Sequence, residues 1–256
     1  MTKTPRLNKT SIEYLTHLWN FYSGCEHWRS GVCPVSNYCW AKRMTERFKA
    51  HYPNGFEPTF YPDALFSPLR LKSPARIGCA FMGDLFGSWN DPTQEIEWQA
   101  PKGSLVKSEL RQAVFDICEA CSQHTFLFLT KCPENLVQWS PFPKNAWVGA
   151  SACDVEGYER ALAGLAVIEV KVKYISFEPL LRRIPPAPLY DLRRDEIQWV
   201  IIGRLTQPSF HPDIYWVEEI VSAADRAGIP VFEKNNLVGS LPIKMPYYRQ
   251  SASSWI

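Results

Sequence analysis

Three cysteines near the N-terminus, Cys25, Cys33 and Cys39, lie within one short stretch, GCEHWRSGVCPVSNYCWAKRM at residues 24–44. Thiolates are soft ligands, and three of them directed at one point suit either an iron–sulfur cluster or a tetrahedral zinc ion. A [4Fe–4S] cluster held by three cysteines keeps one iron without a protein ligand, and that iron can chelate a small molecule. Zinc would need a fourth ligand, which His27 can supply. The chain is long enough between the cysteines for either site, and three buried free cysteines remain a further interpretation.

Length and composition describe a folded protein. The chain has 256 residues, 46% of them hydrophobic, and a net charge of +2. We expect a single domain over residues 1–256, with an irregular tail from about Leu237, and the length is close to the roughly 250 residues of a (β/α) barrel. A nearly neutral chain has no global basic field, so any contact with nucleic acid must be local.

Cysteine usage indicates the compartment. Eight cysteines are far fewer than a disulfide scaffold of this length contains. The start of the chain has no apolar run typical of a secretory signal, and no window approaches the length of a membrane span. We therefore expect a cytoplasmic protein with reduced thiols and no membrane partner, in which clustered cysteines signal metal binding or catalysis more often than crosslinks.

Short apolar segments alternate with helical patterns along most of the chain. This alternation is typical of a parallel sheet, and the lack of a glycine-rich phosphate fingerprint favours a (β/α) barrel or partial barrel over an open dinucleotide-binding fold. Helices are predicted at 39–51 and 104–124 and from Pro133, Asp154 and Asp213. Strands are predicted in the second half of 12–22 and at 76–82, 125–131, 146–151, 173–179, 198–203 and 229–234.

Nearly every predicted strand ends in polar residues. Because the carboxyl ends of parallel strands meet on one face, these side chains and the cysteine loop after the first strand should share one rim. Salt bridges that simply cap the barrel are the structural alternative. The rim residues are Gly83, Asp84, Thr130, Lys131, Ser151, Ser176, Glu178, Gly203, Arg204, Glu233 and Lys234.

The remaining cysteines divide by position. Cys79 lies within a predicted strand, and Cys118 and Cys121 lie on the apolar face of a predicted helix, so all three are expected in the core. Cys132 and Cys153 follow strand ends. Either could face the site as a hydrogen-atom donor or an extra ligand.

Several short motifs, taken in order, resemble a known family: the three-Cys-motif proteins of phage and microbial genomes, which are similar to radical S-adenosylmethionine (radical SAM) enzymes. The resemblance covers about Trp19 to Leu237. Its motifs are the three cysteines followed by WAKRM, then FMGDLFG (81–87), FLTKCPENL (128–136), VGAS (148–151), ISFEPLL (175–181), WVIIG (199–203) and VFEKNNL (231–237).

The resemblance implies a radical SAM-type enzyme with a [4Fe–4S] cluster on Cys25, Cys33 and Cys39. S-adenosylmethionine (SAM) would bind the open iron, an electron donor would reduce the cluster, and cleavage of SAM would lead to hydrogen abstraction from a substrate, for which nucleic acid or a nucleotide is the leading candidate. Predicted cofactor-binding residues are Asp84, Thr130, Lys131, Ser151 and Ser176, and predicted catalytic residues are Glu178, Lys234 and Cys132.

The chain departs from this family at two places. Five residues separate Cys33 from Cys39, where the family usually has two, and Arg204 follows Gly203 in place of a second glycine. Arg204 could there bind an anion. Two other classes of protein compete: a zinc-stapled barrel that binds nucleic acid or a partner, and a metal-assisted hydrolase that uses Asp84 and Glu178.

Overall fold

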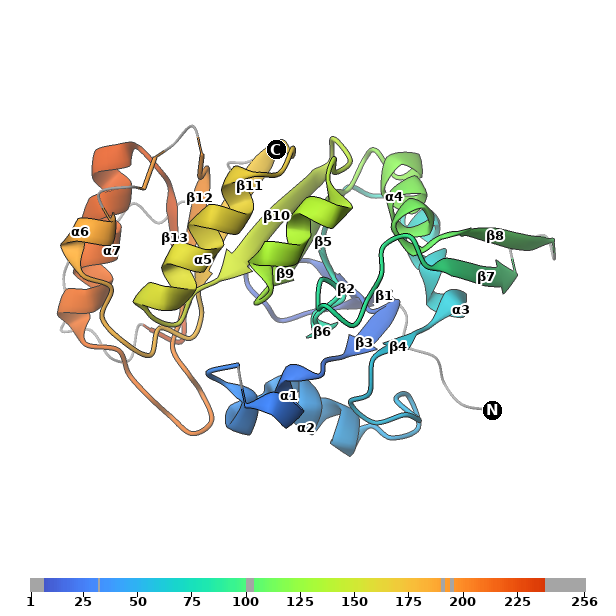
Figure 1. The fold of residues 1–256 in the computed structure, drawn as a ribbon, viewed down its shortest axis with the longest axis horizontal. Helices are drawn as coiled ribbons and strands as arrows, with labels where there is room; N and C mark the ends of the chain where they lie inside the picture. Colours follow the sequence, from blue (N-terminus) through green and yellow to red (C-terminus); the bar gives the residue numbers. More distant parts are fainter. Residues whose placement is uncertain (1–6, 32, 100–103, 190–191, 194–195, 238–256) are drawn as a thin grey trace.

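A computed structural model of the protein describes residues 7–31, 33–99, 104–189, 192–193 and 196–237, and the tail predicted after Leu237 lies outside them. Its central element is an eight-stranded sheet (Figure 1). β1 is antiparallel to β2, and every other neighbouring pair is parallel. In spatial order the strands are β1 (Leu7–Lys9), β2 (His17–Trp19), β5 (Arg76–Cys79), β9 (Thr125–Thr130), β10 (Ala146–Ser151), β11 (Val172–Phe177), β12 (Trp199–Ile202) and β13 (Val231–Glu233).

All seven predicted strands occur in the parallel part of this sheet, which confirms a mixed α/β fold. Of the two predicted forms, a barrel or a partial barrel, the closed barrel is not found, because among the described residues β13 pairs with β12 alone and β1 occupies the edge beside β2. Leu18 of β2 and Phe232 of β13 nevertheless pack into one apolar cluster, although their strands lie at opposite ends of the parallel run. The sheet therefore curves around this cluster as an open, partial barrel.

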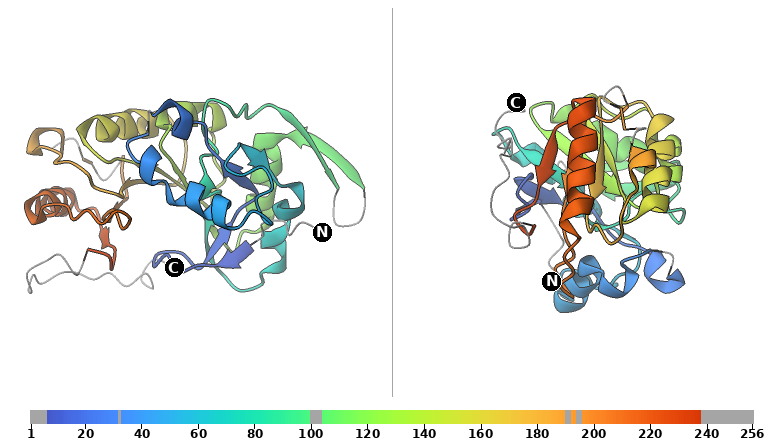
Figure 2. Two further views of the ribbon diagram at one scale, coloured as in Figure 1. Left: turned by 90° about the horizontal axis from the view of Figure 1, so that it is seen from below. Right: turned by 90° about the vertical axis from the view of Figure 1, so that its left-hand side faces the viewer.

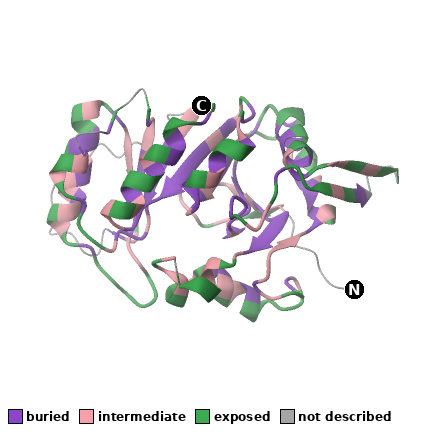
Figure 3. Cartoon of the chain, viewed as in Figure 1, coloured by how far each residue is buried: buried purple, intermediate pink, exposed green. Residues whose placement is uncertain are grey.

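Alternate residues of each strand face opposite sides of the sheet. On the inner side Leu127, Tyr174 and Ile201 pack against Tyr14 and Leu15, which fill the space enclosed by the curve. On the outer side the intervening residues, such as Phe126 and Phe128, join the main core. Burial of both faces explains why the strands are continuous apolar runs (Figure 3).

Three long helices pack on the outer side of the sheet: α4 (Leu110–Ala120), α5 (Val155–Ala166) and α7 (Ile214–Ala227), seen in Figure 2. Asp154 caps α5 by accepting a bond from the Gly157 amide at 2.9 Å, and Asp213 caps α7 by accepting one from Tyr215 at 2.9 Å. These caps satisfy amides that a helix start exposes, so both predicted helix starts are confirmed. Among the described residues no helix is long and apolar enough to cross a membrane.

The other helices are short. They are α1 (His27–Ser30), α2 (Trp40–Arg47), α3 (Pro62–Leu65) and α6 (Pro186–Leu189), with 3₁₀ turns η1 (Ser36–Tyr38), η2 (Ser67–Arg70) and η3 (Pro133–Trp139). The segment from Pro133, predicted as an α-helix, is thus a 3₁₀ helix. The helix predicted at 39–51 is confirmed as α2, although it ends earlier.

Two small sheets complete the fold. β3 (Tyr22–Gly24) lies between β4 (Thr59–Phe60) and β6 (Met82–Gly83), while β7 (Glu95–Gln99) and β8 (Leu105–Glu109) form an antiparallel hairpin that extends from the body (Figure 1). The helix predicted at 104–124 therefore begins at Leu110. Residues 105–109 form β8 because they pair with β7, a partner that local pattern does not reveal.

Gly149 makes room for a large ring on the inner side of the sheet. It lies opposite Tyr174, whose hydroxyl donates to the carbonyl of Phe128 at 2.8 Å. A Cβ at position 149 would lie 2.3 Å from the Tyr174 ring. This glycine lets Tyr174 lie across the sheet below the strand ends.

We predict that Gly149→Ala lowers the free energy of unfolding by about 1–3 kcal/mol, because the added methyl group overpacks a fully buried site. Urea unfolding followed by circular dichroism measures this change. Gly157→Ala is the control: the nearest atom to its new Cβ would be the end of the Asp154 side chain at 3.2 Å, so a smaller effect is expected. Equal effects would contradict the packing argument.

Candidate functional site

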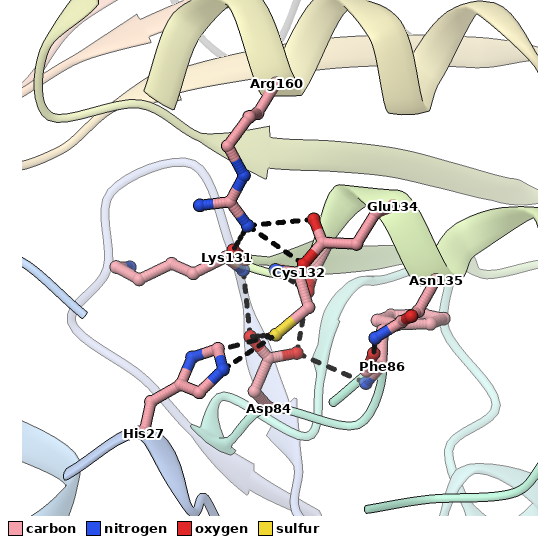
Figure 4. A network of polar contacts seen from close by, with 9 residues as sticks. His27, Asp84, Phe86, Lys131, Cys132, Glu134, Asn135 and Arg160 are labelled. Atoms are coloured by element: carbon pink, nitrogen blue, oxygen red, sulfur yellow. Dashed lines mark hydrogen bonds and ion pairs between the residues drawn. The ribbon is translucent and has the colours of Figure 1, made fainter. Parts of the chain in front are cut away.

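The carboxylate of Asp84 joins two loops at the carboxyl ends of the strands (Figure 4). Its Oδ1 accepts bonds from the Thr130 hydroxyl at 2.7 Å and the Phe86 amide at 3.2 Å, and its Oδ2 accepts from the Lys131 amide at 2.8 Å. The Cys132 thiol donates to Oδ2 at 3.7 Å. Asp84 is buried, and these bonds fix the residues that follow β9 against the turn that follows β6.

The same residue also contacts the start of the cysteine loop. The Asp84 amide donates to the Gly24 carbonyl at 3.1 Å, and Gly24 pairs with Gly83 between β3 and β6. A Cβ on Gly83 would lie 2.2 Å from the Gly24 oxygen. Gly24 itself has φ +94°, a left-handed conformation that favours glycine. The two glycines thus allow the close backbone approach that places Cys25 next to the turn of Asp84.

Lys131 extends from the end of β9 toward β10 and the cysteine loop. Its Nζ donates to the Ser151 hydroxyl at 3.2 Å. Burial lowers the pKa of Lys131, but its electrostatic interactions with Cys33, Cys153, Asp84 and Cys39 raise it, and the pKa lies above its usual value. The ammonium group therefore stays charged in the middle of a group of thiols.

The three cysteines of the loop lie close enough to influence one another. All three are free, partly exposed thiols. Burial raises the pKa of Cys25 to about 12, and the charges of Asp84, Cys33 and Cys39 add to the increase. For Cys33, burial also raises the pKa, while Lys131 opposes the rise. The predicted ligands thus share one environment with Lys131 and Asp84.

Cys132 connects the strand ends to the cysteine loop. Its buried Sγ lies 3.8 Å from both ring nitrogens of His27 (Figure 4), and the His27 ring packs edge-on against Trp89 with centroids 5.1 Å apart. Burial, followed by the charge of Asp84, raises the pKa of the Cys132 thiol far above its usual value. Cys132 is therefore a neutral thiol near pH 7.

A second polar group lies farther along the strand ends. Glu178 and Lys234 form an ion pair between the residues that follow β11 and β13, and a Cβ on Gly203 would lie 3.1 Å from each of the two side chains. Ser176 is fully buried, and its hydroxyl has no partner within the described part of the chain. Strand alternation puts Lys131, Ser151, Ser176, Glu178 and Lys234 on the inner side of the sheet.

Thr130 and Arg204 have internal roles. Thr130 faces the outer side, donates to Asp84 and accepts a bond from the Cys132 amide at 2.8 Å, so its hydroxyl orders the loop after β9. The Arg204 guanidinium donates to the Asn236 carbonyl and, at 2.7 Å, to the Ser209 hydroxyl. These bonds connect the loop after β12 to the segment after β13. They also occupy some of the guanidinium N–H donors that Arg204 would need to bind an anion.

Sequence patterns did not identify the contact between His27 and Cys132, which are far apart in the chain, nor the supporting role of Asn90. The Asn90 amide donates to the carbonyls of Leu85 at 2.8 Å and Asp84 at 3.4 Å and so shapes the turn that carries Asp84. A polar residue shortly after FMGDLFG is a weak signal, because many surface loops contain asparagine.

The donor set can be compared with the two metal groups that three thiols suit. Among the described residues no three His, Cys, Asp or Glu side chains are grouped tightly enough to hold one metal ion. A zinc ion needs four ligand atoms within about 2.3 Å of a single point, whereas each thiolate of an iron–sulfur cluster binds a different iron. Two features of this structure suit a cluster: the cationic Lys131 beside Cys33 and Cys39, and the buried indole N–H of Trp28, which has no partner in the described residues and could donate to a sulfur.

Comparison with known proteins identifies the family and the fold. Residues 9–237 match the family described as Protein of unknown function (DUF5131), and the chain belongs to this family. Comparison with curated proteins gives no match.

Solved structures of spore photoproduct lyase are similar to the chain. A mutant bound to a dinucleoside spore photoproduct has a TM-score of 0.53 with 10% identity, and the match covers 89% of this chain and 78% of that one. A second mutant has a TM-score of 0.52 at the same identity and coverage. The described part of the chain therefore shares the fold of spore photoproduct lyase.

We predict that Asp84→Asn destabilises the protein by about 2–3 kcal/mol, because the amide nitrogen cannot accept the bonds that the carboxylate oxygen accepts and leaves a buried donor unpaired. Chemical unfolding monitored by tryptophan fluorescence measures the change. Asp116→Asn removes the same charge from an exposed helix position and should change stability by less than about 0.5 kcal/mol. If Asp84→Asn unfolds at the same denaturant midpoint as the wild type, the carboxylate does not hold the loops together.

Proposed function

We propose that the protein is a radical SAM-type enzyme in which Cys25, Cys33 and Cys39 hold a [4Fe–4S] cluster. The observation that carries this proposal is the proximity of the loop's three free thiols to one another and of Cys33 and Cys39 to Lys131, at the carboxyl ends of the parallel strands. Parallel α/β folds build their active sites at that end of the sheet. A purely structural metal has no physical reason to be placed there.

Bound to these cysteines, the cluster would supply one-electron reduction of SAM, and an external electron donor would be needed to reduce it. The protein's own contribution begins with charge. Three thiolates bring substantial negative charge to a half-buried loop, and Lys131 supplies a nearby positive charge that offsets part of it. Asp84 contributes by fixing the Lys131 backbone rather than by offering a free oxygen.

Ser151, Ser176 and Glu178 would bind SAM or the substrate. All three lie on the inner side of the sheet at the strand ends, and Ser176 has a buried hydroxyl with no partner within the described residues. A buried unpaired hydroxyl costs free energy unless a ligand or water satisfies it. Glu178, paired with Lys234, offers a fixed carboxylate that would accept bonds from the hydroxyls of a nucleoside.

Cys132 would serve as a hydrogen-atom donor to a substrate radical, and the thiyl radical left on its sulfur would need one electron from the external donor and one proton to return to the thiol. It is a neutral thiol with a bond to donate, and it lies between His27 of the cysteine loop and the Asp84 turn. The raised pKa keeps the proton on sulfur near neutral pH, which hydrogen-atom donation requires. Its burial limits access by water and by other thiols.

Nucleic acid is the substrate class that we propose. Support comes from the fold of spore photoproduct lyase, a structure of which holds a dinucleoside spore photoproduct. At 10% identity this similarity concerns the fold, so the substrate of this chain needs its own test. The zinc-stapled barrel remains the competing proposal, and it depends on His27 as fourth ligand.

We predict that Cys25→Ala, Cys33→Ala and Cys39→Ala each lose most of the iron and sulfide that the anaerobically reconstituted protein binds, and lose reductive cleavage of SAM to 5′-deoxyadenosine. Iron and sulfide analysis and chromatography of the nucleoside product measure both effects. Cys121→Ala is the control, because this thiol lies in the core beyond α4. Zinc without iron in the wild-type protein, released by His27→Ala, would refute the cluster.

We predict that Glu178→Gln keeps the iron but lowers the rate of 5′-deoxyadenosine formation by about tenfold, because one charge-assisted hydrogen bond to a ligand is lost. The matched control is Glu219→Gln on α7, which breaks a surface ion pair with Arg183. Its iron content and rate should equal those of the wild type. An unchanged rate in Glu178→Gln would remove this carboxylate from the site.

A further inference from the structure

One face of α2 is exposed and carries both aromatic and basic side chains. Trp40, Arg43 and Arg47 recur at spacings of three and four residues, so they lie along one face of the helix. All three are exposed, and the Trp40 side chain is 45% exposed. The opposite face buries Ala41 and Thr45. Within the described residues, packing gives no reason for an exposed tryptophan on the same helix face as two arginines.

Aromatic exposure is concentrated at this place. In the described part of the chain the exposed aromatic side chains are Tyr38, Trp40, Phe48, Phe210 and Tyr215, and three of these five lie within residues 38–48. The Arg47 guanidinium lies over the Phe48 ring, 5.3 Å from its centroid. Flat rings next to guanidinium groups are the surfaces on which unpaired bases stack.

Positive charge is concentrated there as well. Residues 27–51 contain five Lys and Arg side chains and one glutamate, a net charge of +4, whereas the whole chain carries +2. Lys42 pairs with Glu46 and Arg29 pairs with Glu57. Within the described residues Arg43, Arg47 and Lys49 form no ion pair, so their charges are available to phosphates.

The helix that carries this face adjoins the candidate site. α2 begins directly after Cys39 and packs against β6, which precedes Asp84. Figures 1 and 2 show α1 and α2 on the side of the sheet toward which the parallel strands run. A chain bound along α2 would therefore lie beside the strand ends.

We propose that the α2 surface, defined as Tyr38, Trp40, Arg43, Arg47, Phe48 and Lys49, binds single-stranded nucleic acid and directs it to the strand ends. This inference depends on the proposed function in one respect only: the proposed function says what the site at the β-strand ends does to the bound nucleic acid. The basic residues contact phosphates, and the aromatic rings stack on bases. A duplex hides its base faces and could use only the charges, so a single strand fits the surface better. An acidic protein is the other occupant that the test separates.

The test is fluorescence anisotropy of the full-length, anaerobically purified protein with a labelled 12-nucleotide single strand, as DNA and as RNA, and with the corresponding duplex. Arg43→Glu combined with Arg47→Glu should weaken single-strand binding at least tenfold. It should also reduce the slope of log affinity against log salt by about 1.4, since each phosphate contact contributes about 0.7. Trp40→Ala should weaken binding about fivefold through lost stacking.

Lys144→Glu combined with Lys171→Glu is the matched control. It changes the net charge equally at two exposed positions that precede β10 and β11, at the end of the sheet opposite the strand ends. Its affinity should stay within about twofold of the wild type at physiological salt, where charges beyond the Debye length of about 8 Å are screened. Circular dichroism of every variant verifies that it is folded.

Several results would overturn the proposal: an α2 double variant that binds as the wild type does, a control that loses affinity equally, or a duplex bound as tightly as the single strand. A charge effect without any effect of Trp40→Ala would also overturn it, because the strand would then be held by charge alone, without stacking on the rings. A preference between DNA and RNA identifies which nucleic acid the protein binds.

The test is independent of the cluster. Oligonucleotide binding requires neither iron nor SAM cleavage, so a failure of the α2 proposal and a failure of the cluster proposal are separate results.

Discussion

The buried carboxylate of Asp84 is the interaction on which the rest of the site depends. It accepts bonds from Thr130, Lys131 and Cys132, and its own amide is bonded to Gly24 at the entrance of the cysteine loop. A buried carboxylate is stable only when its oxygens are well supplied with donors, so the two loops must stay together for it to be satisfied. The distance between the cysteines and the strand ends is thereby fixed by one residue that has little capacity left for a ligand.

Around this contact the sheet separates structural from chemical roles by simple alternation. Residues on the outer side of the sheet join the core with α4, α5 and α7. On the inner side, polar side chains lie at the carboxyl ends of the strands: Lys131, Ser151, Ser176, Glu178 and Lys234. Glycine at 149 and 203 keeps the inner side roomy enough for Tyr174 below and for the Glu178–Lys234 pair above. On the inner side of the curved, open sheet, aromatic rings therefore lie below the polar residues of the strand ends.

Charge is distributed in keeping with this division. The whole chain is close to neutral, yet the segment from the cysteine loop through α2 is distinctly positive. Lys131 interacts electrostatically with Cys33 and Cys39 of the loop. These positive charges would stabilise thiolates in the loop, and the same field would attract an anionic substrate toward the rim. Overall composition does not reveal this local charge.

The sequence by itself determined the seven parallel strands, the helix starts at Asp154 and Asp213, and the burial of Cys79, Cys118 and Cys121, because apolar periodicity and capping are local properties. It also indicated that Asp84, Lys131 and the three cysteines belong to one end of the sheet. The tertiary structure alone decided that residues 105–109 form a strand and that the sheet stays open. It likewise decided that Asp84 bonds to the loop after β9 and that Cys132 meets His27. Each of these depends on partners far away in the chain, and such pairings follow from how the elements pack together rather than from the pattern of any one segment.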